Sequence, residues 1–529
     1  MAHNGWTTLN KPKKGWKSLR NAAQTLRLQI RAIRQICPKC LMAPESSGVK
    51  DKSAKIVVAN NLRSIYIFTM RLFRVLSGIV YSRFLLLFGS TILCAARLAS
   101  AADTSTNLFN APATEAAAPT DQTWNWHFQN TDIIQYHPAF HARYAGPNSM
   151  RNVNEVKETV SLDLYAGVRL WHGAEFHVDG LMWQGFGLSA THGAEAFPNG
   201  EAFRVGTKVP NVTFARAFIQ QTIGLGGEQE VMEDDALQLP RKEDVSRLTL
   251  TLGKMSAKDI FDNNTYANDP RSQFMSWSLM ANAAWDYPAD ALGYITGFAA
   301  ELNQPTWALR AGLFQMPRSA NGVALDPNYL DAWGLIGEFE RRFAICEHPG
   351  AIGFMAYLNR AHMGSYQESL DAPARPVDIQ ATRKYRYKFG FGLNAEQEIT
   401  KHLGAFFRLG WSDGQNEAWA FNDVDRAASF GLSLKGAMWR RPNDTVGLAG
   451  VINAASTVHQ EFFAVGGVGI LAGDGKLSYG LEKSMETYYD FELCKHAHAT
   501  LDYQFITNPA FNRDRGPISV ISARLHWSF

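Results

Sequence analysis

Segments in which apolar and polar residues alternate recur along most of the chain, and no other feature constrains the fold as strongly. In the last nine residues the apolar members are Ile521, Ala523, Leu525, Trp527 and Phe529, with mostly polar residues between them. A period of two is typical of a β-strand with one apolar and one polar face. We count sixteen such segments, with approximate centres at residues 130, 165, 179, 219, 250, 296, 310, 337, 355, 389, 407, 433, 449, 490, 503 and 524.

The links between these segments alternate in length. One set is mostly tight and has the sequences WHGA, NQPT, CEHPG, TKHL, RRPND and KHAH. The other set is mostly long and includes residues 185–213, 257–288, 360–384 and 454–484. Short turns on one side and long loops on the other are typical of transmembrane β-barrels. The link at residues 224–246 breaks this rule, because it is long on the side of the tight turns.

We therefore predict an all-β fold, a transmembrane antiparallel β-barrel of sixteen strands with long external loops partly folded into the lumen. A closed barrel pairs its backbone hydrogen-bonding groups without water, so its apolar face can contact lipid. A soluble β-propeller or a large sandwich would place polar residues on its exposed face. Neither explains the aromatic pairs Tyr385/Tyr387 and Trp527/Phe529, which are similar to the aromatic girdles of membrane barrels.

Charge and hydropathy divide the chain into four parts. Residues 70–101 have a positive start, an apolar run and an A-x-A sequence at their end, which predicts a secretory signal peptide cleaved after Ala101. We expect the basic residues 1–69 to lie outside the mature protein, residues 102–123 to form a flexible leader, and residues 124–529 to form the barrel. The chain after residue 101 is acidic overall, which argues against nucleic acid as a partner. We expect export to the bacterial outer membrane, where lipid surrounds the barrel.

Sixteen strands enclose an aqueous lumen, so the default function is passive diffusion through a pore. The third external loop, between the fifth and sixth segments, is expected to narrow that pore. Its candidate constriction and sugar-binding residues are Lys258, Asp259, Asp262, Asn263, Asn264, Tyr266, Asp269 and Arg271. The second external loop adds Glu201, Arg204 and Lys208. Inward-facing strand positions add a possible lumen lining of Asp163, Arg169, Glu175, Arg216, Arg408, Asp490, Asp502 and Arg524.

The mixture of charges in these loops favours a neutral, polyhydroxylated solute. Carboxylate and guanidinium groups can each engage two neighbouring hydroxyls, and aromatic rings stack on the apolar face of a sugar. A pore for anions would have a mainly basic constriction, and a pore for cations a mainly acidic one. The sequence therefore predicts small neutral sugars or polyols as solutes.

Several stretches of this chain also resemble a known family. The stretches are LYAGVRLWHGAE, GFGLS, FPNGEAFRVG, ARAFIQQT, LTLGKMSAKDIFDNNTYANDPR, WDYPADALGY, LRAGLF and, near the C-terminus, LDYQFITNPAFNRD. They are similar to the carbohydrate-selective porins, the OprB family of bacterial outer-membrane channels, from about Phe128 to Phe529. The resemblance implies a sixteen-stranded barrel that admits glucose and related sugars or polyols through a pore narrowed by charged inward loops. The long link near residues 224–246 departs from the family pattern.

The sequence offers little support for an enzyme, and we predict no cofactor and no metal site. The glycine-rich stretch VGGVGILAGDG lacks the strand–turn–helix setting of a phosphate-binding loop. His496 and His498 lack accompanying carboxylate or cysteine ligands. We expect Cys346 and Cys494 to be unpaired. A pair such as Asp259/Asp262 could imitate a glycosidase dyad, so an outer-membrane hydrolase stays as a minor alternative.

Two other assignments remain open, and a third is excluded. A general diffusion porin would share every strand pattern described above. A polysaccharide export barrel would also share it, but export of an anionic polymer favours a strongly basic lumen. An energy-coupled receptor would need a plug domain and more strands than this length allows. The sequence leaves a homotrimer and a monomer equally open.

Overall fold

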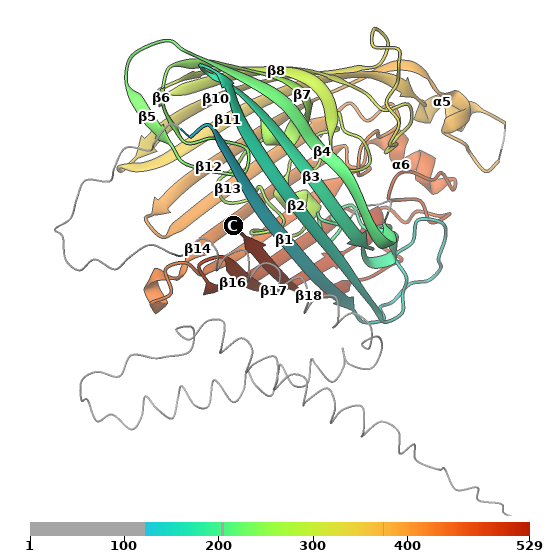
Figure 1. Ribbon diagram of the computed structural model, residues 1–529. Coiled ribbons are helices and arrows are strands. Elements are labelled where there is room, and N and C mark those ends of the chain that lie inside the picture. The colour runs from blue at the N-terminus through green and yellow to red at the C-terminus, as the bar shows by residue number, and fades with distance from the viewer. Residues whose placement is uncertain (1–121, 203–205, 374) are drawn as a thin grey trace, which may run out of the picture. The chain divides into compact units, whose positions relative to one another are not determined.

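The computed structural model describes residues 122–202, 206–373 and 375–529. The predicted upstream segment 1–69, the signal peptide 70–101 and nearly all of the leader 102–123 lie outside these residues. The described residues form a closed β-barrel of sixteen antiparallel strands (Figure 1). The predicted fold is therefore confirmed.

Each barrel strand pairs with its neighbour in the sequence, and β1 pairs with β18 to close the barrel. The strands are β1 (Trp124–His137), β2 (Glu155–Trp171), β3 (Ala174–Gly185), β4 (Thr207–Gly224), β7 (Arg247–Met255), β8 (Ile295–Gln304), β9 (Trp307–Gln315), β10 (Trp333–Ile345), β11 (His348–Met363), β12 (Lys384–Thr400), β13 (Leu403–Ser412), β14 (Arg426–Lys435), β15 (Thr445–Ala454), β16 (Glu482–Cys494), β17 (Ala497–Thr507) and β18 (Ile518–Ser528). Each of the sixteen predicted segment centres lies within one of these strands. A separate two-stranded sheet, β5 (Gln229–Met232) and β6 (Arg241–Asp244), lies in the link between β4 and β7.

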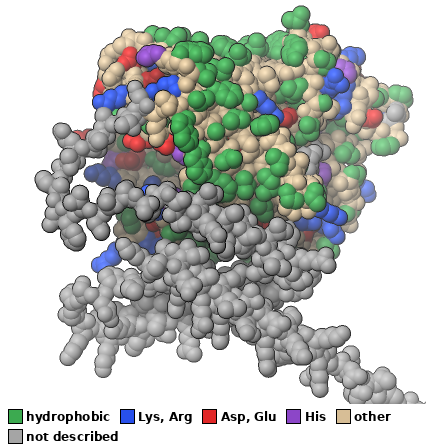
Figure 2. Space-filling view, in the orientation of Figure 1, with side chains coloured by type: hydrophobic (Ala, Val, Ile, Leu, Met, Phe, Trp, Pro, Cys, Tyr) green, Lys and Arg blue, Asp and Glu red, His purple; other side chains and the backbone are tan. Residues whose placement is uncertain are grey.

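The wall of the barrel has its apolar side chains outside and its polar side chains inside. On β2, Leu164 is 52% exposed whereas its neighbour Asp163 is fully buried, and on β13 Leu409 is exposed whereas Arg408 is buried. In Figure 2 hydrophobic side chains gather over the outer face of the strands at the front of the barrel. This distribution is the reverse of a water-soluble sandwich and suits a lipid environment.

The two rims of the barrel differ in their links. At the short-turn rim the strands are joined by two-residue turns at 172–173, 305–306, 346–347, 401–402 and 495–496, by the link 436–444 with η4 (Gly436–Trp439), and by the longer link 225–246. At the long-loop rim the links contain η1 (Leu188–Ala190), η2 (Ala257–Asp259), α4 (Trp277–Met280), α5 (Tyr366–Asp371), η3 (Gln380–Thr382), α6 (Thr457–Ala464) and η5 (Pro509–Phe511). In Figure 1, β5 and β6 lie at the rim opposite α5 and α6. No helix among the described residues is long and apolar enough to cross a membrane.

Candidate functional site

The link between β7 and β8, residues 256–294, folds into the barrel and contacts its wall on several sides; we call it the inward loop. It starts with a capping box, in which the Ser256 hydroxyl accepts from the Lys258 backbone N–H and the Asp259 carboxylate accepts from the Ser256 N–H. Further along, the backbone oxygens of Pro270 and Gln273 accept from the Arg524 guanidinium of β18 at 2.7 and 2.8 Å. The capping box thereby orders the start of the loop, and Arg524 attaches its middle to the wall.

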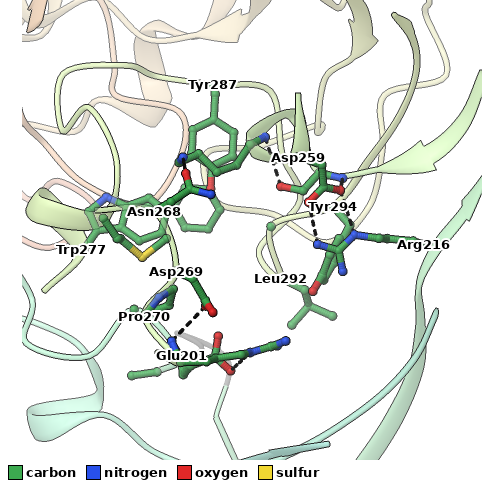
Figure 3. Close-up of a pocket in the computed structure, with 18 of the residues that line it drawn as sticks. Glu201, Arg216, Asp259, Asn268, Asp269, Pro270, Trp277, Tyr287, Leu292 and Tyr294 are labelled. Carbon is green, nitrogen blue, oxygen red and sulfur yellow. Dashed lines mark hydrogen bonds and ion pairs between the residues drawn. The ribbon is translucent and has the colours of Figure 1, made fainter. Parts of the chain in front are cut away.

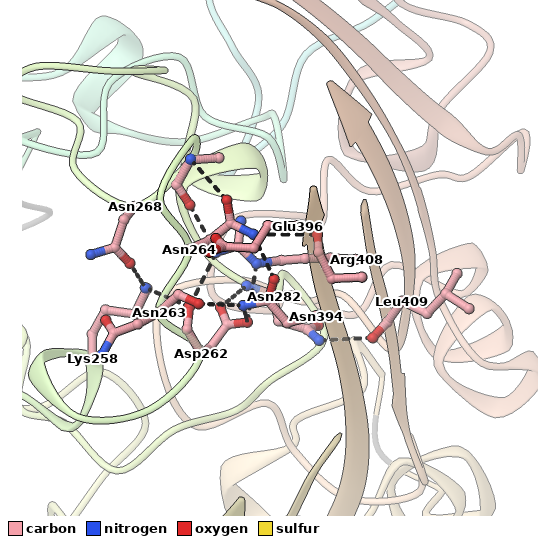
Figure 4. Close-up of polar contacts among 12 residues, drawn as sticks. Lys258, Asp262, Asn263, Asn264, Asn268, Asn282, Asn394, Glu396, Arg408 and Leu409 are labelled. Atoms are coloured by element: carbon pink, nitrogen blue, oxygen red, sulfur yellow. Dashed lines mark hydrogen bonds and ion pairs between the residues drawn. The ribbon is translucent and has the colours of Figure 1, made fainter. Parts of the chain in front are cut away.

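Asp262 attaches the inward loop to the wall formed by β10, β12 and β13 (Figure 4). Its backbone N–H donates to Glu338 at 2.7 Å, and its carboxylate accepts from Asn394 and Arg408, each at 3.0 Å. The same carboxylate accepts from the backbone N–H of Asn282 at 2.8 Å, so it joins two parts of the loop. Asp262 and Arg408 are both 2% exposed. Because an unpaired buried charge is costly, the pair holds the loop strongly.

Carboxylates of the wall also accept backbone N–H groups from the loops. Glu486 of β16 accepts from the N–H groups of Met275 and Ser276 at 2.5 and 2.9 Å. Glu482, four residues earlier on the same inward face, accepts from the backbone N–H groups of Glu195, Ala196 and Ala510. Each such carboxylate satisfies loop donors that a folded-in segment would otherwise bury without partners.

A cavity of about 460 Å³ lies between the inward loop, residues 186–202 of the preceding long loop and the wall (Figure 3). Arg271 lines it and lies 2.9 Å from Glu201 and 2.9 Å from Asp163. Arg216 of β4 lies 2.7 Å from Asp179 and 2.7 Å from Asp259. Each guanidinium is thus flanked by two carboxylates, and the cavity presents paired charges of both signs.

Aromatic side chains form another part of the cavity lining. The ring of Trp277 stacks on Phe197 with centroids 5.2 Å apart and lies 4.6 Å from the ring of Phe421. Tyr287 lies against both Trp277 and Phe421, and Tyr294 lies under the Arg216 guanidinium at 5.0 Å. The cavity therefore combines flat apolar faces with hydrogen-bonding charged groups.

Lys258 and Asp269 are charged groups of the inward loop whose pKa values are lowered. Burial lowers the pKa of Lys258 to about 8, despite the nearby carboxylate of Asp262. Burial alone would raise the pKa of Asp269, but the Arg271 charge and its backbone N–H hold it below its ordinary value. Lys258 is consequently the lining group whose charge changes near neutral pH.

The predicted site residues divide into those that line the cavity and those that hold the loops. Six of the predicted loop residues line the cavity: Glu201, Lys258, Asp259, Asn263, Asp269 and Arg271. Three others contact the wall instead: Asp262 as described, Asn264 through a 2.8 Å hydrogen bond to Asn394, and Tyr266 through packing beside Gly404 of β13. Arg204 lies outside the described residues.

Lys208 is placed differently from its predicted position. The strand β4 begins at Thr207, so Lys208 belongs to the wall and not to the second external loop. Further along the same strand, Val212 and Phe214 are 73% and 68% exposed. Lys208 is exposed and does not line the cavity. The prediction for Lys208 was wrong because the sequence did not show where the strand starts.

The predicted lumen-lining residues lie on the inner side of the wall, and most are occupied with holding other segments. Arg216 lines the cavity, Asp163 pairs with Arg271, and Arg408 and Arg524 hold the inward loop. The remaining four have other neighbours: Asp490 accepts from His498 and Thr500, Asp502 accepts from Gln504, and Arg169 and Glu175 contact the link 225–246. Among the described residues no group of three or more His, Cys, Asp or Glu could hold a metal ion. Cys346 and Cys494 are free thiols.

The sequence analysis missed the aromatic part of the site. Trp277, Tyr287 and Tyr294 lie beyond residue 274, where the candidate stretch was ended, and Phe197 and Phe421 come from other loops. The only available signal was the density of aromatic residues in WDYPADALGY, which alone does not show that the segment turns inward.

A closed barrel with an apolar exterior, a polar lumen and a loop folded across that lumen is typical of outer-membrane porins. A family comparison agrees, because residues 147–529 match the carbohydrate-selective porin, OprB family. The chain belongs to this family, whose members are channels.

Individual relatives are more distant. The high-pH structure of Pseudomonas putida OprB is 16% identical and covers 77% of this chain and 94% of its own, with a TM-score of 0.59, which shows a shared fold. Porin AaxA of Chlamydia abortus is 24% identical over 282 residues, 53% of this chain and 54% of its own. Porin AaxA of Chlamydia caviae is 26% identical over 282 residues, 53% of each chain. The chain thus matches about half the length of these curated porins.

Proposed function

We propose that this porin admits small neutral carbohydrates, monosaccharides such as glucose and polyols, into the periplasm by passive diffusion. The observation that carries the proposal is the composition of the cavity, where Trp277 and Tyr287 share the lining with Glu201 and Arg271. Aromatic faces favour the C–H face of a pyranose ring, and carboxylates and guanidinium groups favour its hydroxyls.

The balance of charge in the cavity supports a neutral solute over an ionic one. The guanidinium groups of Arg216 and Arg271 each have two carboxylates within 2.9 Å. A site for anions needs cations that are free to pair with the solute, and a site for cations needs free carboxylates. A sugar hydroxyl can replace one of the hydrogen bonds between a guanidinium group and a carboxylate while the other charged contacts of that guanidinium stay in place.

Liposome swelling with purified protein tests this proposal. We expect glucose, other hexoses and polyols to enter faster than disaccharides, and faster than zwitterionic amino acids of similar size. The variant Arg271→Ala should reduce the preference for sugars over amino acids more than it changes bulk conductance. Arg143→Ala is the matched control, because Arg143 is exposed and pairs with Asp514 in another loop.

The outcomes separate the alternatives. Rates that follow solute size alone would make this protein a general diffusion porin. An absence of swelling with every solute would favour an export barrel or an outer-membrane hydrolase. Equal sugar preference in Arg271→Ala and the control would remove Arg271 from the selective part of the pore.

We also propose that residues 70–101 act as a signal peptide and that cleavage after Ala101 produces the mature chain. The positive start, apolar run and A-x-A sequence support this assignment. N-terminal sequencing of protein extracted from outer membranes should begin at Ala102. A mature N-terminus upstream of residue 70 would contradict the proposal. Light scattering of the same material would distinguish a monomer from a homotrimer.

A further inference from the structure

The long link at the short-turn rim folds back into the barrel. Residues 225–246 form the hairpin β5–β6, paired from Gln229↔Asp244 to Met232↔Arg241. The segment that joins the two strands, residues 233–240, is turned by paired backbone hydrogen bonds between Asp235 and Gln238, each 3.1 Å. We call residues 233–240 the strap. Its last two residues, Leu239 and Pro240, are buried, so the strap is packed against the barrel and does not project freely.

Three neighbouring wall strands hold the strap. The Asn125 amide of β1 donates to the Asp234 carboxylate at 2.8 Å and to the backbone oxygens of Asp235 and Gln238 at 3.2 and 3.0 Å. Asn125 is 6% exposed, so these bonds are made inside the barrel and not on its surface. One amide thereby fixes both sides of the turn.

The other anchor is a carboxylate on β3. Glu175 lies 2.8 Å from Arg241, the residue that follows the strap, and accepts from the buried backbone N–H of Leu239 at 3.4 Å. Arg169 of β2 donates to the backbone oxygen of Pro240 at 3.4 Å. Glu175 and Arg169 are inward-facing residues, so the end of the strap is held over the lumen.

The strap reaches the same cavity as the inward loop. Asp235 and Leu237 line that cavity, and Leu237 packs against the buried apolar cluster that contains Trp277 and Tyr287. Two segments from opposite rims of the barrel therefore border one space. Since the short-turn rim of such barrels faces the periplasm, the strap lies on the exit side.

We propose that the strap limits the size of solutes at the periplasmic exit of the pore, with Asp235 and Leu237 as the side chains that set this limit. The inference deepens the proposed function, because it names a second part of the molecule that selects among solutes. Asn125 and Glu175 are positioning residues, since they act on the solute only by holding the strap.

The structure itself suggests the variant that removes the strap. The backbone N–H of Leu225 donates to the oxygen of Ser246 at 2.9 Å, and Gly226 and Gly227 have φ values of +84° and +104°. Two residues with positive φ between paired strand ends are what a tight hairpin turn requires. Deleting residues 228–245 leaves Leu225-Gly226-Gly227-Ser246, which can close β4 to β7 like the other short turns.

The test measures single-channel conductance in planar bilayers and swelling with a monosaccharide and a disaccharide. We expect the deletion to raise ion conductance at least about two-fold and to raise the ratio of disaccharide to monosaccharide entry. Leu237→Ala should change both in the same direction by a smaller factor. Val231→Ala is the matched control, because Val231 is an exposed apolar residue of the same hairpin that does not line the cavity.

Unchanged conductance and an unchanged ratio in both the deletion and Leu237→Ala would overturn the proposal. If the deletion fails to fold, Leu237→Ala against Val231→Ala decides alone. Ion conductance does not depend on sugar recognition. A wild-type protein that rejects sugars, while the deletion still raises conductance, would therefore contradict only the proposed solute and not the strap.

Discussion

The wall-facing and cavity-facing sides of the inward loop use the same residue types for different purposes. On the wall side, Asp262 and Arg408 form an almost fully buried pair that no solute can reach. On the cavity side, Arg271 pairs with Glu201 at a similar distance but borders open space. All four side chains are largely buried, but only Arg271 and Glu201 line the cavity. A charged residue of the inward loop therefore either holds the loop to the wall or borders the cavity, according to what it faces.

The largest expected effect comes from breaking the wall side. Asp262→Ala leaves Arg408 buried without its carboxylate, which costs about 3–5 kcal/mol for a pair of this kind. The loop should detach while the barrel persists, so single-channel conductance should rise several-fold and become noisy. Asp262→Asn keeps the hydrogen-bonding shape of the side chain, so its conductance should lie between those of the wild type and Asp262→Ala. Wild-type conductance in Asp262→Ala would contradict the division of the loop into two sides.

A second loss of stability is expected at the next attachment. Glu486→Ala leaves the backbone N–H groups of Met275 and Ser276 without acceptors, at about 1–3 kcal/mol for each buried donor. Urea unfolding in detergent should show the decrease, and limited proteolysis should cut the loop earlier. Glu368→Ala is the control, since Glu368 is a loop residue whose side chain is 42% exposed where it pairs with Lys384 and Arg386. Equal stability of the two variants would argue against Glu486 as an anchor.

On the cavity side, the main expected effect of a substitution is on the binding of sugar. Trp277→Leu removes a flat face from the lining, and aromatic contacts of this kind contribute about 0.5–1.5 kcal/mol. We expect sugar-induced block of ion current to weaken about two- to twelve-fold, which is that energy expressed as an affinity ratio. The urea midpoint should also fall, because Trp277 is 6% exposed and packs against other rings. A loss of stability as large as that of Glu486→Ala, without any change in sugar block, would place Trp277 on the structural side of the comparison.

The smallest effect is a pH dependence. Burial lowers the pKa of Lys258 to about 8, so raising the pH from 7 to 9 removes most of its positive charge. The cavity then becomes more negative, and reversal potentials in a salt gradient should shift toward cation selectivity. Lys258→Met should be insensitive over this interval.

The same group affects folding with a definite sign. The ordinary pKa of lysine is 10.5, so between about 8 and 10.5 the unfolded chain binds more protons at Lys258 than the folded chain does. Stability therefore rises with pH in this window and levels off above it. Lys258→Met should remove this slope. A stability that falls between pH 8 and 10 in the wild type, but not in Lys258→Met, would contradict the lowered pKa.

The sequence located the inward loop but did not show which of its side chains line the cavity. Residues 256–274 were identified because polar and charged residues are dense there, and six of the predicted loop residues line the cavity. Their separation from Asp262, Asn264 and Tyr266 could not be predicted, because in a loop without regular periodicity the direction of each side chain depends on long-range contacts. Lys208 was misplaced for a related reason, since a strand boundary depends on pairing with β3.

The alternation of apolar and polar residues determined the sixteen strands and the apolar outer face, because a period of two is a local property that survives in the one-dimensional sequence. The lengths of the links between the strands determined the two unequal rims. The tertiary structure decided which loops enter the lumen, which charges are buried as anchors, and that the acidic link 225–246 turns back toward the cavity. Those outcomes depend on hydrogen bonds such as Asn125–Asp234, between residues 109 positions apart, and pairing at that separation leaves no periodic trace in the sequence.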